Sequence, residues 1–151
     1  MKRGLIPLLI ALLLSGCDRG PQSNLPTTPM TIGSKTYTLE IAAKNEERNK
    51  GLMQRDSMPA DHGMIFLFAK DTDEGFWMKN TRIPLDILYI QQDGKVITIK
   101  HMLPYHLETV SSDGKYRYAI ELNSGQADAC GIKQGDTVKI PDVIRSTKSD
   151  P

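Results

Sequence analysis

The sequence predicts a mainly β protein, a small barrel or sandwich of about six to seven short strands with one or two short helices. Its 151 residues, of which 39% are hydrophobic and 25% charged, suit a single globular domain. Between residues 32 and 141, most segments place an apolar side chain at every second position, as half-buried strands do. Turn residues separate these segments at short intervals, which is typical of barrels and sandwiches.

The first half of the domain is expected to hold three strands and a helix. Apolar and polar residues alternate over 37–41, which predicts a strand with one buried face. A short helix is expected over 45–50, capped by its first residue, Asn45, and ended by a glycine. The apolar segments 64–68 and 76–79 predict two further strands.

The second half is expected to continue with a hairpin. Strands over 85–91 and 96–102 flank an Asp-Gly turn. A further strand is expected over 116–122, followed by a short helix over 124–130 that a glycine ends. A last short strand is expected over 137–140.

The N-terminus has the pattern of an export signal. A short basic stretch is followed by an apolar run that ends at Leu14. The run is too short to span a bilayer, which takes about 20 residues. Leu14-Ser15-Gly16-Cys17 resembles the lipobox of bacterial lipoproteins, so residues 1–16 are predicted to be a signal peptide and Cys17 to be lipidated. Asp18 resembles the residue that favours retention in the inner membrane.

The expected location is therefore the periplasmic side of the cell membrane, held by the acyl chains of Cys17. Residues 17–31 are predicted to form a Pro-rich tether, at most about 45–50 Å long when extended. Residues 32–141 form the β-rich domain, and 142–151 are expected to be a polar, frayed tail. The formal net charge of +1 argues against nucleic acid as a partner. The sequence indicates no cofactor.

Five motifs follow one another in order within the domain. They are Gly51-Leu52-Met53-Gln54-Arg55, Gly63-Met64-Ile65-Phe66, the run from Phe76 to Asp86, Ala119-Ile120-Glu121-Leu122, and Gly131-Ile132-Lys133-Gln134-Gly135-Asp136. In this order and spacing they resemble domain-of-unknown-function family 192, a prokaryotic family. The resemblance covers about residues 32–141. It implies a compact β-rich fold, often on exported chains, and no established reaction.

The densest polar stretch is the candidate contact site. In a functional interpretation, Lys79 and Arg82 bind an anion or a sugar, Trp77 offers a stacking face and Asp86 orients a donor. In a structural interpretation, Asn80 forms a corner, Asp86 bonds backbone amides and Lys79 is a solvated charge. Both interpretations remain open from the sequence.

Two arginines flank the Gly-Leu-Met motif. Arg48 and Arg55 are expected to form supporting ion pairs with a carboxylate such as Asp86 or Glu121. Such pairs commonly organise a fold without taking part in chemistry.

Two other functions have weaker support. A soft-metal site for Cu(I) or Ag(I) would use His62 and Met64, which share a face of a strand, although methionines also fill small cores. An envelope hydrolase would use Asp86 with His101 or His106 as acid and base. Because no hydrolase motif accompanies these residues, the sequence favours binding over catalysis. The favoured function is a binding or accessory module of the cell envelope, with an envelope protein or a small molecule as its partner.

Overall fold

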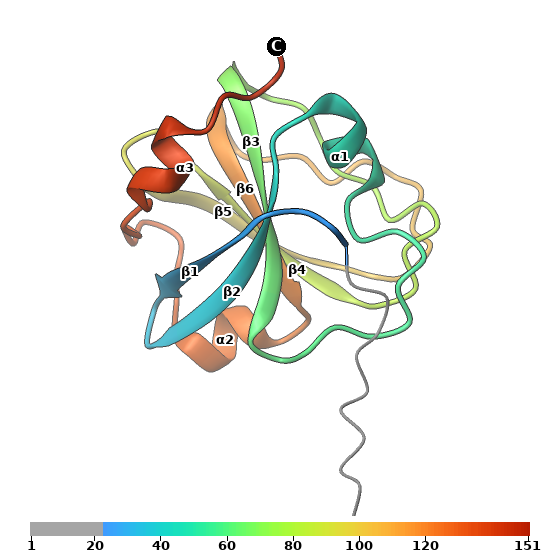
Figure 1. The fold of residues 1–151 in the computed structure, drawn as a ribbon. Coiled ribbons are helices and arrows are strands. Elements are labelled where there is room, and N and C mark those ends of the chain that lie inside the picture. Colours follow the sequence, from blue (N-terminus) through green and yellow to red (C-terminus); the bar gives the residue numbers. More distant parts are fainter. Residues whose placement is uncertain (1–22) are drawn as a thin grey trace, which may run out of the picture.

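The computed structural model describes residues 23–151 and contains six strands and three short helices (Figure 1). Along the chain these are β1 (Thr27–Ile32), β2 (Lys35–Ala42), α1 (Asn45–Lys50), β3 (His62–Thr72), β4 (Leu85–Ile90), β5 (Val96–Met102), β6 (Tyr116–Asn123), α2 (Gln126–Cys130) and α3 (Asp142–Ser146). The predicted signal peptide and Cys17 lie outside the described residues. No helix of the described part is long and apolar enough to cross a membrane.

The strands form one twisted sheet in the order β1-β2-β3-β6-β4-β5. Every neighbouring pair is antiparallel except β2 and β3. The mainly β class is thus confirmed. Within residues 23–151 the edge strands β1 and β5 do not pair with each other, so the sheet is not closed into a barrel. Apolar side chains from α2, α3 and the segment between them cover the face that a barrel would enclose.

Both faces of the sheet are buried. The helix-covered face packs side chains such as Leu39, Ile65 and Ile120 against Ala127 of α2 and Ile144 of α3. The loop-covered face packs side chains of the central strands against apolar residues from the loops around α1, before β4 and after β5. It includes Leu52, Met64, Phe66, Met78, Tyr89 and Tyr116. Figure 1 shows α3 at the upper left and α2 at the bottom of the molecule, and α1 with the long loops at the right.

An aromatic chain stiffens the loop-covered face. Phe66 meets Phe76 edge to face at 4.9 Å between ring centres, and Phe76 meets Tyr89 at 5.8 Å. Tyr89 in turn meets Tyr116 at 4.8 Å. Each such pair adds about 0.5–1.5 kcal/mol beyond the area it buries. The chain fixes the loop that carries Phe76 on the sheet.

Two of the expected strands are wrong. Residues 76–79 make only a single bridge, between Phe76 and Val110, and otherwise form a loop. The segment is apolar because this loop inserts Met78 into the core, where it is 1% exposed. Residues 137–140 likewise make only one bridge, between Thr137 and Lys95. In both segments the apolar residues are explained by burial of loop side chains and not by a strand.

Both ends of the domain are more ordered than the sequence suggests. Residues 27–31, assigned to the tether, belong to β1, in which Thr28, Met30 and Ile32 are buried. Pro29 argued against a strand in the sequence, but β1 is an edge strand, where proline is tolerated. The tail forms α3 and then returns to α1, where Asp150 Oδ2 accepts from the backbone N–H of Asn45 at 3.1 Å. The tail is therefore packed on the domain.

Candidate functional site

Glu121 is a buried carboxyl in the middle of the sheet. It lies on β6 between Met64 of β3 and Ile87 of β4, and it faces the loop-covered core. The residue is 5% exposed, and no side-chain hydrogen bond is found for its carboxyl among residues 23–151. Because no fully buried side-chain nitrogen or oxygen atom in this part of the chain lacks a partner, the carboxyl oxygens are open to a small cavity. Burial raises the pKa of Glu121 to about 8, and the nearby Arg55 guanidinium only partly opposes this shift. At neutral pH the group is therefore mostly a neutral acid.

A small cavity of about 30 Å³ lies over Glu121. Its lining includes Leu52, Phe66, Phe76, Trp77 and Thr81, which come from two loops and from β3. Since a water needs about 10–15 Å³ of such space, the cavity admits one or two water-sized groups. The mouth is marked by Trp77, which is 49% exposed. The site is thus a recess with an aromatic wall on one part and the polar residues Arg48, Asn49 and Lys50 of α1 on another, and it ends on a carboxyl.

The end of helix α1 and the glycine after it line one part of this cavity. Glu47 Oε2 accepts from the backbone N–H groups of Ala43 and Lys44, both at 2.9 Å, so Lys44 is the N-cap and the expected capping by Asn45 is wrong. The helix ends at Gly51, which has φ +46°. A β-carbon there would be strained, and it would lie 3.5 Å from the Phe66 ring. Because 3.5 Å is an ordinary contact, it is the positive φ rather than lack of space that requires glycine at position 51.

Three non-glycine residues with positive φ gather in the loops around the cavity. They are Gln54 (φ +63°), Asn80 (φ +55°) and Tyr105 (φ +61°). Backbone hydrogen bonds join these loops, from Gln54 N–H to Asn80 O at 2.8 Å and from Tyr105 N–H to Thr81 O at 3.1 Å. Such conformations cost about 1–3 kcal/mol each and concentrate at functional sites. The loops are therefore held in one defined shape at a local cost.

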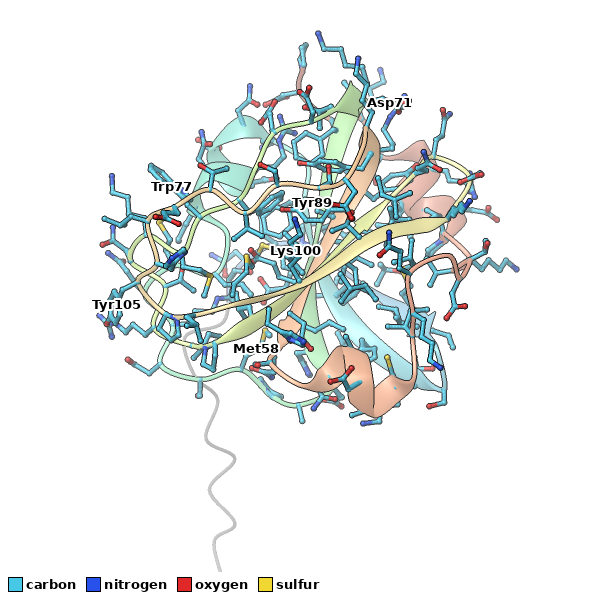
Figure 2. The ribbon with its side chains drawn as sticks, turned by 180° about the vertical axis from the view of Figure 1, so that it is seen from behind. Met58, Asp71, Trp77, Tyr89, Lys100 and Tyr105 are labelled. Atoms are coloured by element: carbon cyan, nitrogen blue, oxygen red, sulfur yellow. The ribbon has the colours of Figure 1, made fainter. Side chains whose placement is uncertain are left out.

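The predicted contact corner is brought together in part. Trp77, Lys79, Asn80 and Arg82 lie on one exposed loop, and Figure 2 shows Trp77 at the periphery of the molecule. Lys79 Nζ stands 4.9 Å from the centre of the Trp77 ring. Arg82 Nη1 donates to Asp56 Oδ1 at 2.5 Å. Asn80 makes the corner with its left-handed backbone, as its residue type permits.

Asp86 is separated from this corner because it points to the helix-covered face. It is fully buried, and both of its oxygens are bonded: Oδ1 contacts His101 Nδ1 at 2.6 Å, and Oδ2 accepts from the Ala127 N–H at 2.9 Å. This matches the structural interpretation, in which Asp86 bonds backbone amides. Of the two candidate histidines, His101 contacts Asp86, whereas His106 lies 3.8 Å from Glu108. Hydrolysis by Asp86 and His101 stays a prediction.

The two arginines find partners that the sequence did not indicate. Arg55 grips Glu40 with two bonds, of 2.5 and 2.8 Å, and both residues are buried. Although burial alone would raise it, the pKa of Glu40 is lowered by hydrogen bonds from Arg55 and Ser23. Arg48 Nη1 donates to backbone carbonyls, those of Ala43 and Leu67. Glu40 was missed because it alternates with apolar residues like a solvent-facing side chain, while β2 is covered on both faces.

The two candidate ligands of the soft-metal hypothesis, His62 and Met64, differ in how deeply they are buried. Met64 is 1% exposed in the loop-covered core, and His62 is half-buried with its Nδ1 2.8 Å from Asp61 Oδ1. Among residues 23–151, no three His, Cys, Asp or Glu side chains gather to hold a metal ion. Methionine is not among these four residue types, so Cu(I) or Ag(I) binding by His62 and Met64 stays a prediction.

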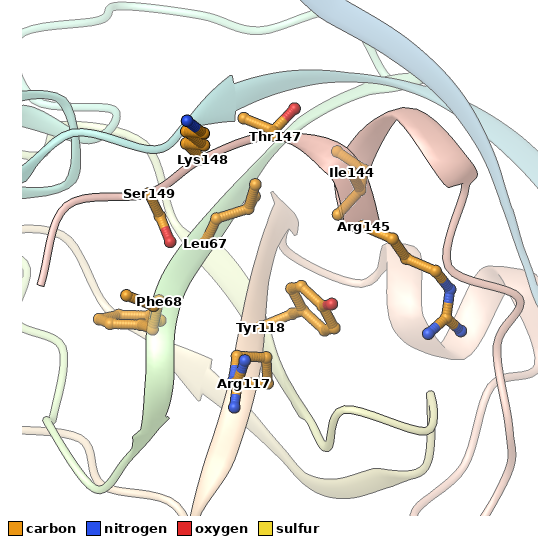
Figure 3. Close-up of a pocket in the computed structure, with 10 residues that line it drawn as sticks. Leu67, Phe68, Arg117, Tyr118, Ile144, Arg145, Thr147, Lys148 and Ser149 are labelled. Carbon is orange, nitrogen blue, oxygen red and sulfur yellow. The ribbon is translucent and has the colours of Figure 1, made fainter.

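Larger hollows are present elsewhere, and one of about 400 Å³ lies beside Val96 and Gly135. Two others differ from the Glu121 cavity in their polar groups. One, of about 340 Å³, lies between the ends of β3 and β6 and the C-terminal segment (Figure 3). Its two arginines already serve the fold, since Arg117 bonds Asp71 and Arg145 bonds the carbonyl of Ile140. The other, of about 540 Å³, adjoins the Glu121 cavity, because Lys50 and Gly51 line both. Only the Glu121 cavity, among these four, ends on a buried carboxyl without a partner.

These features define a small single-sheet β domain with a carboxyl at the base of an aromatic recess. The chain belongs to the DUF192 family (Uncharacterized ACR, COG1430), which it matches over residues 28–140, and this confirms the resemblance of its motifs. Four of the five motifs contribute a residue to the Glu121 cavity. No curated protein matches the chain.

Two solved structures are similar to this chain. A protein of unknown function from Novosphingobium aromaticivorans is 36% identical, with a TM-score of 0.73, and the match covers 80% of this chain and 89% of that one. A protein from Sinorhizobium meliloti described as a "putative transcription regulator" is 35% identical, with a TM-score of 0.69, covering 74% of this chain and 89% of that one. Both support the fold as described.

Proposed function

We propose that this protein is a lipid-anchored binding domain of the cell envelope, and that its ligand site is the cavity over Glu121. The anchor is Cys17, on the periplasmic side of the inner membrane, as Asp18 suggests. The observation that carries the binding site is Glu121 itself. A buried carboxyl without a hydrogen-bond partner costs stability, and such groups are retained where a ligand or a reaction uses them.

The recess holds only one or two water-sized groups, so it favours a single hydroxyl group of an uncharged ligand such as a sugar, with the rest of the ligand outside against Trp77. The pKa of about 8 keeps Glu121 protonated at neutral pH, so it donates one hydrogen bond and accepts another, as a hydroxyl group requires. Trp77 beside it offers a flat apolar face to a ring. Lys50 at the lining and Lys79 over Trp77 oppose a cationic ligand.

Binding is favoured over catalysis because Glu121 lacks a free second group. Acid–base catalysis commonly uses two groups with separated pKa values. Glu40, which faces the same side of the sheet, has both oxygens held by Arg55. The cavity therefore has one carboxyl group, that of Glu121, with which to bind a ligand.

The test uses the only tryptophan of the chain, Trp77, as a fluorescent reporter of the site. Titration with glucose, N-acetylglucosamine and glycerol is expected to give a saturable change for at least one sugar. Because a neutral ligand buries the carboxyl further, it prefers the protonated form, and wild-type affinity should fall about tenfold from about pH 7 to about pH 9.

Two variants and one further probe sharpen this experiment. Glu121→Gln can still donate and accept a hydrogen bond with the ligand, so it should bind without that pH dependence. Glu46→Gln, on the exposed surface of α1, should behave as wild type. Tetramethylammonium tests the opposite ligand class. Fluorescence that no sugar changes, or a saturable response to tetramethylammonium that grows above about pH 8, would overturn the proposed ligand class.

A further inference from the structure

Exposed apolar side chains are concentrated beside the cavity. Of the five large hydrophobic residues that are most exposed, four lie on the loop between β3 and β4, which lines the cavity, or on the loop after β5, which is hydrogen-bonded to it: Trp77 (49%), Leu103 (70%), Tyr105 (60%) and Leu107 (67%). We call these four residues the apolar rim. Figure 2 shows Trp77 and Tyr105 along the same edge of the molecule. Apolar residues clustered in this way mark an interaction surface.

The rim is one rigid surface, because backbone hydrogen bonds join its two loops. Met78 N–H donates to His106 O at 2.9 Å, and Tyr105 N–H donates to Thr81 O at 3.1 Å. Phe76 and Val110 exchange two bonds, of 2.9 and 2.7 Å. A surface held in this way loses little conformational entropy when something docks on it.

The length of chain before the domain limits what can reach this surface. Ser23 donates a hydrogen bond to Glu40, Leu25 packs on the loop-covered core, and β1 follows from Thr27. Only six residue steps then separate Cys17 from Ser23, which is at most about 20 Å of extended chain. An acylated Cys17 would therefore hold the domain against the bilayer surface, far closer than a tether of residues 17–31 allows.

The attachment point and the rim lie on the same side of the molecule. Ser23 and Leu25 line the 540 Å³ hollow together with Lys50 and Gly51. Lys50 and Gly51 also line the Glu121 cavity, as does Trp77 of the rim. A bilayer near Ser23 is thus also near the rim.

We propose that the apolar rim rests in the headgroup region of the bilayer that anchors the protein, which assumes the lipid anchor of the proposed function. Tryptophan and tyrosine favour this depth, where the ring meets hydrocarbon and its polar atom meets water. Leu103 and Leu107 add apolar area, and Lys79 beside Trp77 adds a positive charge that anionic headgroups attract. The Glu121 cavity then opens at the membrane surface.

The test places the acylated protein in vesicles of phosphatidylethanolamine and phosphatidylglycerol with brominated acyl chains. Bromine quenches tryptophan at short range, so Trp77 emission is expected to fall by at least about half and to shift to the blue, as for an interfacial ring. The double variant Leu103→Ser, Leu107→Ser should lose most of this quenching. Val143→Ser, which changes the fifth exposed hydrophobic residue on α3, is the matched control and should not.

Two readouts separate failure of this proposal from failure of the anchor. The mass of the purified protein and its sedimentation with vesicles report acylation of Cys17 independently of Trp77. A protein that is acylated and sediments, but whose Trp77 emission stays unquenched, overturns the docking proposal and leaves the anchor intact. Equal quenching in the double leucine variant and in wild type also overturns it. A mass without acyl chains overturns the anchor on which both proposals rest.

Discussion

Two buried carboxyl groups lie on neighbouring strands and face opposite sides of the sheet. Asp86 on β4 is fully buried and bonds two donors, His101 Nδ1 and the Ala127 N–H. Glu121 on β6 is 5% exposed and has no partner among the described residues. The two hydrogen bonds of Asp86 offset the cost of burying it and fix α2 on the sheet. The carboxyl of Glu121 is left free to bond a ligand.

The covers of the two faces differ in the same way. Helices and apolar side chains close the helix-covered face around Asp86. Loops close the other face, and they contain the three non-glycine residues with positive φ and the apolar rim. Strained backbone, exposed apolar groups and an unpartnered acid thus occur together on one face, which is where we place the function.

The largest expected effect is on stability at Glu121. The pKa rises from 4.5 in the unfolded chain to about 8 in the folded one, so the folded protein keeps a proton that the unfolded chain releases. Its contribution to stability is complete below about pH 4.5 and is lost as the pH rises to about 8. At about pH 9, Glu121→Gln should therefore increase the free energy of unfolding by about 3–5 kcal/mol.

Urea denaturation across this pH range measures the difference between the variant and wild type. At about pH 4 the two proteins should have similar free energies of unfolding, because both carry a neutral group. Loss of stability in Glu121→Gln at every pH would mean that Glu121 has a structural partner after all. The contrast with Asp86 would then disappear.

The second effect has the opposite sign. Asp86→Asn should lower the free energy of unfolding by about 2–3 kcal/mol at neutral pH, because the amide cannot accept both charge-assisted bonds. Asp128→Asn, an exposed residue in the first turn of α2, is the matched control and should change stability by less than about 0.5 kcal/mol. A neutral outcome for Asp86→Asn would show that its two bonds do not hold α2.

The sequence predicted β6 from its alternating apolar residues and β5 from the Asp-Gly turn before it, because both signals are local properties of the chain. It did not distinguish a strand from the loop at Phe76, since burial of loop side chains depends on what packs above them. The contact corner was predicted in part, with Trp77 and Lys79 at the cavity mouth and Asp86 behind the sheet. The partnership of Arg55 with Glu40 joins residues of separate elements, and no local pattern encodes it.

The smallest expected effect concerns the strained loops that distinguish the loop-covered face. Gln54 is exposed and has φ +63°, a conformation that glycine adopts without strain. Gln54→Gly should therefore raise the free energy of unfolding by about 0.5–1 kcal/mol, after the entropy that glycine adds to the unfolded chain is subtracted. Gln134→Gly, at an exposed position without a positive φ, should instead lower it by a similar amount. Equal losses in both variants, measured by urea denaturation, would show that the loops around the cavity carry no stored strain and would leave Glu121 as the feature that separates the two faces.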